Sequence, residues 1–292
     1  MNDIDQKAIE LYDIYTTAVG GKAWDGKPLP CGKDFLADPS KQTQANGWRA
    51  VAAHVLTPFN SSIARHAKAS AEAGQSSIVN PKTYRIAIDI GHAAGTGTRV
   101  NGADEHDESV HNAAILKTIL ESYTADRFEV DIIDFAAETN TGDLNKTIHA
   151  INAGHYDLAI SLHCDSSTNP SARGAHVCHH RTYHADGSYT DSPGGKALAK
   201  EIAARLCPIM PGRANKVQAR PDHDLNLSSL AILRQTKPTT VLVETGFLSN
   251  PEDLERIRAL RYELMRTIAL GIDVYCKSSI ARHAKASAEA GQ

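Results

Sequence analysis

From position 84 onward, short apolar runs alternate with amphipathic stretches of helical length. The apolar runs predict strands over residues 84–90, 128–134, 157–162, 174–178 and 239–244. The stretches between and after them predict helices over 108–123, 143–153, 194–206 and 251–275. Strands that alternate with helices of this length indicate an α/β domain with a mostly parallel sheet flanked by helices.

The first 60 residues follow a different pattern. Residues 4–18 place apolar side chains three and four positions apart, and a second helix is predicted over 48–56, stopped by Pro58. Residues 1–60 are therefore predicted to form a small helical module of marginal independent stability. Such a module either packs onto the main domain or binds the cell wall or a partner, and the sequence leaves both readings open.

The same fifteen letters, SSIARHAKASAEAGQ, occupy residues 61–75 and 278–292. The unit is shorter than solenoid repeats of about 20–50 residues, and it is Ala-rich without a wide apolar face, which is compatible with a helix that need not pack. We interpret 61–80 as a linker, 81–277 as the catalytic domain and 278–292 as a tail, with the duplication natural or engineered. A pair of docking helices is the alternative.

Composition narrows the class of protein. The net charge of −3 argues against a nucleic-acid partner held by phosphate contacts. No apolar run reaches the roughly 18 residues of a transmembrane segment, and the acidic start does not resemble a secretory signal, so synthesis in the cytoplasm is expected. The five cysteines are odd in number and form no close pair, which favours reduced thiols over a disulfide framework.

Metal-type side chains stand where predicted elements begin or end. His92 follows the first strand in a glycine-rich turn, Glu108 opens a helix, and His163 follows the third strand. Each alone is more often structural, but two histidines and a carboxylate at neighbouring ends match a catalytic zinc site with an open position for water. The last predicted strand ends in Glu244, which either caps a turn or serves as the base and acid for a metal-bound water that attacks an amide.

These segments resemble the zinc-dependent N-acetylmuramoyl-L-alanine amidases of the amidase-3 type over about residues 84–275. The resemblance implies a mostly parallel, twisted sheet, Zn²⁺ bound by His92, Glu108 and His163, and Glu244 as the catalytic glutamate. It implies hydrolysis of the bond between N-acetylmuramic acid and L-alanine in peptidoglycan. The matching blocks are Ile88-Asp89-x-Gly-His92, Glu108-x-x-x-Asn112, Ser161-Leu-His163 and Leu242-Val-Glu244-x-Gly-Phe-Leu-Ser-Asn250.

Several assignments around this site stay open. Glu108 is preferred as the second ligand because Asn112 follows it four residues on, and Glu105 is its main rival. Asp89 either orients a ligand or holds the turn, whereas Asp165 adds charge where the family usually has another residue. Arg234 either contacts a stem-peptide carboxylate or is a solvated charge. Residues 178–193 are interpreted as a flexible loop over a cleft rather than a second metal site.

Three functions remain in competition. The first is the amidase, which without a signal peptide would reach the wall as an endolysin released at lysis. The second is a zinc peptidase that cuts peptidoglycan stem peptides. The third is a catalytically inactive wall-binding protein.

Overall fold

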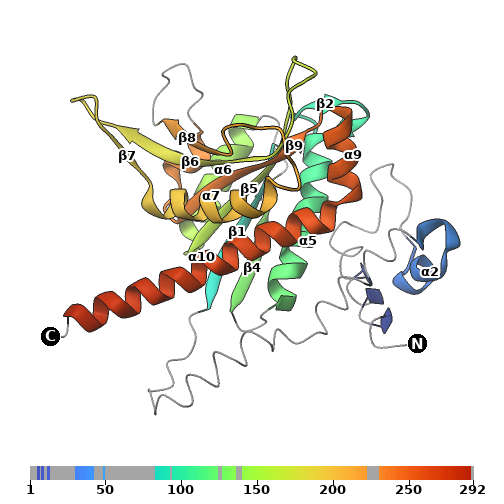
Figure 1. Cartoon of the computed structure of the whole chain (residues 1–292), viewed down its shortest axis with the longest axis horizontal. Helices are drawn as coiled ribbons and strands as arrows, with labels where there is room; N and C mark the ends of the chain where they lie inside the picture. The colour runs from blue at the N-terminus through green and yellow to red at the C-terminus, as the bar shows by residue number, and fades with distance from the viewer. Residues whose placement is uncertain are drawn as a thin grey trace, which may run out of the picture. The chain divides into compact units, whose positions relative to one another are not determined.

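The computed structural model describes residues 83–290, apart from 93, 124–126, 136–139 and 222–229 (Figure 1). Before this stretch it describes residues 30–42 and the positions 5, 6, 8, 9, 12, 13 and 49. The chain divides into two compact units, one of residues 1–83 with 121–127 and one of residues 84–120 with 128–292.

The first unit has a small apolar core of its own. Its described helices are α2 (Gly32–Ala37) and the 3₁₀ helix η1 (Pro39–Lys41), and the described positions of the predicted 4–18 helix are helical. Tyr12 stacks on Phe35 at 4.1 Å between ring centroids, and Ala8 and Leu36 complete the cluster. The predicted 48–56 helix, except position 49, and the copy at 61–75 lie outside the described residues, so the domain boundaries stay a prediction.

The second unit is built on a seven-stranded sheet. Its order is β4-β1-β5-β9-β6-β7, and β8 pairs with β6. The first four strands are parallel, and β6 runs antiparallel to β9, which confirms a mostly parallel sheet. The strands are β1 (Tyr84–Ile90), β4 (Phe128–Ile133), β5 (Leu158–Asp165), β6 (His176–Tyr183), β7 (Tyr189–Asp191), β8 (Val217–Pro221) and β9 (Thr239–Phe247).

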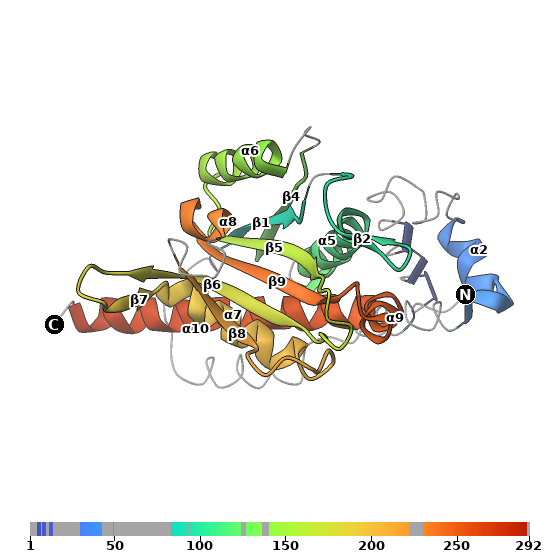
Figure 2. The ribbon, with the colours of Figure 1, turned by 90° about the horizontal axis from the view of Figure 1, so that it is seen from above.

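Helices cover both faces of this sheet, which confirms the α/β prediction. Figure 2 shows α6 (Asn140–Ala153) and α8 (Ala231–Gln235) on one side, and α7 (Pro193–Leu206) and α10 (Arg261–Ala290) on the other. The chain runs from β1 through α5 (Glu105–Tyr123) to β4, and then through α6 to β5 on the other side of β1. Because both connections are right-handed, α5 and α6 lie on opposite faces of the sheet. The short helix α9 (Pro251–Ala259) precedes α10.

Apolar side chains fill the space between sheet and helices. On the α6 side, Ala87, Ala159 and Leu242 from three neighbouring strands pack with Ile148 and Ile151 of α6. Residues of opposite parity, such as Ile86, Ile160 and Val243, are fully buried as well. Burial on both faces explains why these strands are continuous apolar runs in the sequence.

Two segments differ from the sequence prediction. The predicted loop over 178–193 is instead the end of β6, the antiparallel strand β7 and the start of α7. Because β6 is antiparallel to β9, this hairpin extends away from the edge where β9 ends (Figure 1), so the loop-over-a-cleft interpretation is wrong. A short pair, β2 (Arg99–Val100) and β3 (Ala103–Asp104), also precedes α5.

The C-terminal helix is longer than predicted and is interrupted. It breaks at Leu260 between α9 and α10, and α10 then runs on to Ala290, so the described part of the second copy of the duplicated segment continues a helix. Among the described helices, none is long and apolar enough to cross a membrane.

Candidate metal centre

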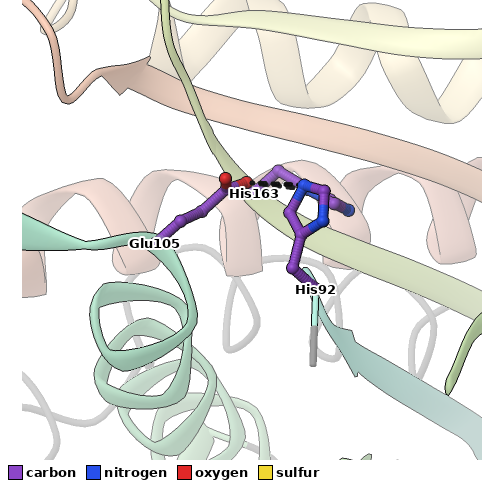
Figure 3. A group of neighbouring side chains, drawn as sticks. All are labelled: His92, Glu105 and His163. Atoms are coloured by element: carbon purple, nitrogen blue, oxygen red, sulfur yellow. Dashed lines mark hydrogen bonds and ion pairs between the residues drawn. The ribbon is translucent and has the colours of Figure 1, made fainter. Parts of the chain in front are cut away.

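His92, Glu105 and His163 converge at one edge of the sheet (Figure 3). One ligand atom from each lies within 4.8 Å of the other two. His163 Nδ1 is 3.0 Å from Glu105 Oε1, and His92 Nε2 is 3.4 Å from the same oxygen. The two imidazole rings meet nearly edge to face, with centroids 5.1 Å apart. Two ring nitrogens and a carboxylate oxygen at this spacing match a catalytic zinc site that keeps an open position.

Parallel pairing of β1 with β5 brings the two histidines together. Ile90 is in register with Leu162, so His92 and His163 leave the same edge. Gly91 donates its N–H to Leu162 O at 2.8 Å, and a Cβ on Gly91 would lie only 2.5 Å from His163 Nδ1. Glycine is therefore required for this close approach. His92 itself has a left-handed φ of 61°, a strained conformation of the kind that concentrates at functional sites.

Glu105 reaches the histidines from the first residue of α5. Its side chain is 4% exposed, and Thr98 N donates to Oε2 at 3.1 Å, which leaves Oε1 directed at the two rings. The start of a helix also favours a negative charge. Sequence reasoning had Glu105 as the rival of Glu108, and the structure brings Glu105 to the histidines.

The electrostatics of this group are coupled. Burial alone would lower the pKa of His163, but its hydrogen bond to Glu105 and the charges of Glu244 and Glu105 raise it to about 9. Burial would raise the pKa of Glu105, whereas the hydrogen bond from His163 and the two histidine charges hold it below its usual range. The arrangement therefore favours the protonated form of His163 and the ionised form of Glu105, and a cation bound between them would displace that proton.

Glu244 lies beside this group on the next strand. It is in register with His163 on β5 and with His176 on β6, so all three side chains share one face of the sheet. Its Oε2 is buried without a hydrogen-bond partner among the described residues, and burial raises the pKa of Glu244 to about 8. A buried carboxylate oxygen without a hydrogen bond lowers the stability of the fold. Glu244 is therefore a candidate functional residue.

Glu108 points elsewhere. It lies one turn further along α5, where its buried carboxylate accepts hydrogen bonds from Arg258 at 2.9 Å and from Arg261. Arg261 also donates to Asn112 Oδ1 at 3.1 Å. Although burial would raise the pKa of Glu108, the two arginines hold it below its usual range. The pair Glu108 and Asn112 thus joins α5 to α9 and α10 and does not enter the metal group.

The remaining predicted residues fall in three places. Asp89 is buried in β1 and accepts a hydrogen bond from Ser161 of β5, two residues before His163. Asp165 lies just beyond His163 and pairs with Arg213 Nη2 at 3.4 Å. Arg234 is exposed in α8, which precedes the amino end of β9, so it lies away from Glu244. Sequence reasoning missed Arg213, because no local pattern marks it.

The block that follows Glu244 fixes the chain after His163. Thr245 Oγ1 donates to His163 O at 3.1 Å, and Leu248 N donates to Asp165 O at 2.8 Å. Asn250 caps α9 through the N–H groups of residues 252 and 253 and donates to Pro170 O at 3.0 Å. The polar residues of this block therefore position the metal group from the neighbouring strand.

Comparison with known proteins agrees with this geometry. A family model described as N-acetylmuramoyl-L-alanine amidase (Amidase_3) matches residues 86–274. The curated N-acetylmuramoyl-L-alanine amidase LytC of Bacillus subtilis (strain 168) is 24% identical over 179 residues, which are 61% of this chain and 32% of LytC. The chain thus spans about a third of the length of that curated relative.

Solved structures share the fold. The catalytic domain of the CD27L endolysin targeting Clostridia difficile is 25% identical, with a TM-score of 0.51 over 65% of this chain and 96% of that one. The amidase Ami1 from Mycobacterium smegmatis is 19% identical, with a TM-score of 0.55 over 68% of this chain and 100% of that one, and this likeness concerns the fold alone.

Two substitutions distinguish the roles of Glu105 and Glu108 in α5. We expect Glu105→Gln to lose stoichiometric zinc, because an amide is a poor replacement for an anionic ligand. Glu108→Gln should keep zinc but lower the free energy of unfolding by about 3–5 kcal/mol, since two arginines lose their buried partner. Zinc content after dialysis and urea unfolding of the metal-free proteins measure both effects. Loss of zinc from the Glu108 variant alone would contradict the assignment.

A pH series tests the state of Glu244. Its pKa rises from the ordinary 4.5 to about 8 on folding, so the metal-free fold loses stability as pH rises through this window. Glu244→Gln removes that loss. The melting temperature of the chelated variant should therefore exceed that of the chelated parent at pH 7.5, and the two should agree near pH 4. An equal difference at both pH values would show that burial of the charge is not the cause.

Proposed function

Since the chain belongs to the N-acetylmuramoyl-L-alanine amidase family of the amidase-3 type, we propose that it hydrolyses the amide bond between N-acetylmuramic acid and L-alanine in peptidoglycan. The observation that carries the proposal is the convergence of His92, Glu105 and His163 beside Glu244, whose buried Oε2 has no hydrogen-bond partner among the described residues. In this reaction water attacks the amide, so no side chain is needed as a nucleophile.

Zinc fits the residues that converge here. Imidazole and carboxylate donors suit Zn²⁺, and the three ligand atoms already lie within 4.8 Å of one another. We propose His92, Glu105 and His163 as the ligands, so that Glu105 replaces Glu108 in this role. When bound, zinc supplies a Lewis acid for the scissile carbonyl and makes water a better nucleophile near neutral pH. His163 Nδ1 and Glu105 Oε1 lie 3.0 Å apart, and both atoms would turn to the cation once the proton between them had left.

Glu244 has the position and the chemistry of the proton carrier. Its side chain projects from the same face as His163, one strand away, at about 4.8 Å between strand axes. We propose that its carboxylate takes a proton from the attacking water and returns it to the leaving amine of L-alanine. Burial raises the pKa of Glu244, and its charged form would be favoured if a cation were held by the neighbouring residues.

The other nearby groups position the reacting ones. Asp89 accepts a hydrogen bond from Ser161, and we propose that this contact fixes the polar surroundings of β5 just before His163. Thr245 holds the backbone of His163, and Gly91 leaves room for its ring. These contacts restrict the rotamers of the metal group before a cation arrives, as a catalytic site requires.

The biological setting is proposed from the same evidence. CD27L is described as an endolysin, and LytC as an N-acetylmuramoyl-L-alanine amidase. We propose that this chain also digests the cell wall, with lysis as one route of access to it. Residues 1–60 are proposed as a separate module that adjusts this activity.

Digestion of purified peptidoglycan tests the function. We expect free stem peptides that begin with L-alanine, detected by mass spectrometry, to vanish with a chelator and to return with added zinc. Glu244→Gln should bind zinc as the parent does but lose at least about 100-fold in rate, as general acid–base residues commonly contribute.

The same digest discriminates the rivals. New amino termini within the stem peptide would support the zinc peptidase in place of the amidase. Binding of wall fragments without cleavage, by a zinc-loaded protein, would support an inactive binding protein. An unchanged rate for Glu244→Gln would refute the role of this residue even if the product is correct.

A further inference from the structure

A group of positively charged side chains lies next to Glu244, on the side away from the metal ligands. Across β9 from His163, His176 of β6 is in register with Glu244. Arg213, in the segment between α7 and β8, brings its Nε to 3.5 Å from His176 Nδ1. The same guanidinium lies 5.0 Å from the centre of the Phe247 ring, which belongs to the end of β9. Arg213 is thus held at the edge of the sheet beside His176, which lies one strand away from Glu244.

The hydrogen-bonding capacity of Arg213 is largely unused. Its contacts to Asp165 at 3.4 Å and to His176 at 3.5 Å are at the long limit for hydrogen bonds. A guanidinium has five N–H donors, and no acceptor among the described residues takes those of Nη1. About a third of the side chain is exposed, at 34%. The group is therefore fixed in place and open to an acceptor from outside.

Arg220 of β8 also has only a weak hydrogen-bond acceptor among the described residues. Its Nε donates to Cys178 Sγ at 3.4 Å, a weak acceptor, and its side chain is half-buried. Arg220 is in register with His180, on the face of the sheet that carries Cys178 and Glu244. Its charge favours the carboxylate forms of Glu244 and Asp165 by lowering the pKa of each, although burial outweighs this effect. Both arginines thus face the same region.

Three other arginines of the domain have short contacts to carboxylates. Arg181 donates to both oxygens of Asp191, at 2.6 and 3.1 Å, and stacks over Tyr189 at 3.7 Å. Arg258 and Arg261 share the buried carboxylate of Glu108. Arg213 and Arg220, by contrast, have only long or weak acceptors among the described residues and lie at the side of β6, one strand away from the proposed proton carrier.

We propose that Arg213, supported by Arg220, binds the free α-carboxylate of the stem-peptide residue that follows L-alanine. The proposal rests on the amidase function and concerns the leaving-group side of that site. Two strand spacings separate His163 from His176, about 10 Å, which an extended peptide spans in about three residues. Arginine is suited to this task because its planar donors match a carboxylate in two places.

Asp165 acts as the internal counter-ion of this subsite. Its Oδ1 accepts a hydrogen bond from Ser166 N at 2.7 Å, while its Oδ2 lies 3.4 Å from Arg213. This long contact keeps the guanidinium of Arg213 near Asp165 but leaves most of its N–H donors available. A peptide carboxylate, with shorter charge-assisted hydrogen bonds of about 2.8 Å, can therefore compete with Asp165 for Arg213.

A matched pair of substrates tests the subsite. The two muramoyl peptides differ only in the residue after L-alanine, which carries a free α-carboxylate in one and a carboxamide in the other, all other carboxyl groups being amidated. The zinc-loaded full chain should prefer the carboxylate by about tenfold or more in kcat/KM, chiefly through KM. Arg213→Gln should abolish the preference and leave the rate for the carboxamide within about twofold, as expected when only one contact is removed.

Arg234→Gln is the matched control, because this exposed arginine of α8 lies away from Glu244 and its loss changes the net charge equally. It should retain the preference. Persistence of the preference in Arg213→Gln, or an equal loss for both substrates, would overturn the subsite. So would a parent enzyme that cleaves both substrates equally well.

A binding measurement separates this inference from the proposed function. Calorimetry with the corresponding free peptides, which need no turnover, should show about tenfold weaker binding of the carboxylate peptide to Arg213→Gln than to the parent. If the parent binds this way but cleaves neither substrate, the amidase function fails and the subsite stands. If binding is the same in parent and variant, the subsite fails whatever the enzyme cleaves.

Discussion

The register of three parallel strands is the constraint on which the site depends. β1, β5 and β9 are neighbours, and their pairing aligns the residues just before His92 with Leu162 and aligns His163 with Glu244. Because all three strands end at one edge, residues more than 150 positions apart in the chain meet there without any long loop. A slip of one residue in β9 would turn Glu244 to the opposite face and bring Val243 or Thr245 to its place.

The two glutamates of α5 have different surroundings. Glu105 begins the helix and faces the histidines, while Glu108, about 4.5 Å further along the axis, closes an ion-pair cluster with two arginines of the C-terminal helices. Glu244, unlike Glu108, has a buried oxygen without a hydrogen-bond partner among the described residues, and its pKa is raised. The buried charge at Glu244 therefore costs stability, whereas the ion pairs of Glu108 join the helices.

Much of this arrangement follows from the sequence. The predicted strands of the parallel sheet are confirmed because their apolar runs are buried on both faces, which is a strong local signal. β7 and β8 were not predicted because they are short and polar. Choosing between Glu105 and Glu108 required knowing that Arg258 and Arg261 lie beside α5, 150 residues along the chain. Arg213 was hidden for the same reason, since it is tied to Asp165 and His176 only through the fold.

We propose that the three converging side chains hold a zinc ion within reach of Glu244. Diffraction from crystals of the zinc-loaded chain, recorded on both sides of the zinc absorption edge, tests it directly. We expect one strong anomalous peak about 2.0–2.2 Å from a nitrogen of His92, a nitrogen of His163 and an oxygen of Glu105. A peak ligated by Glu108, or none at this edge of the sheet, would contradict it.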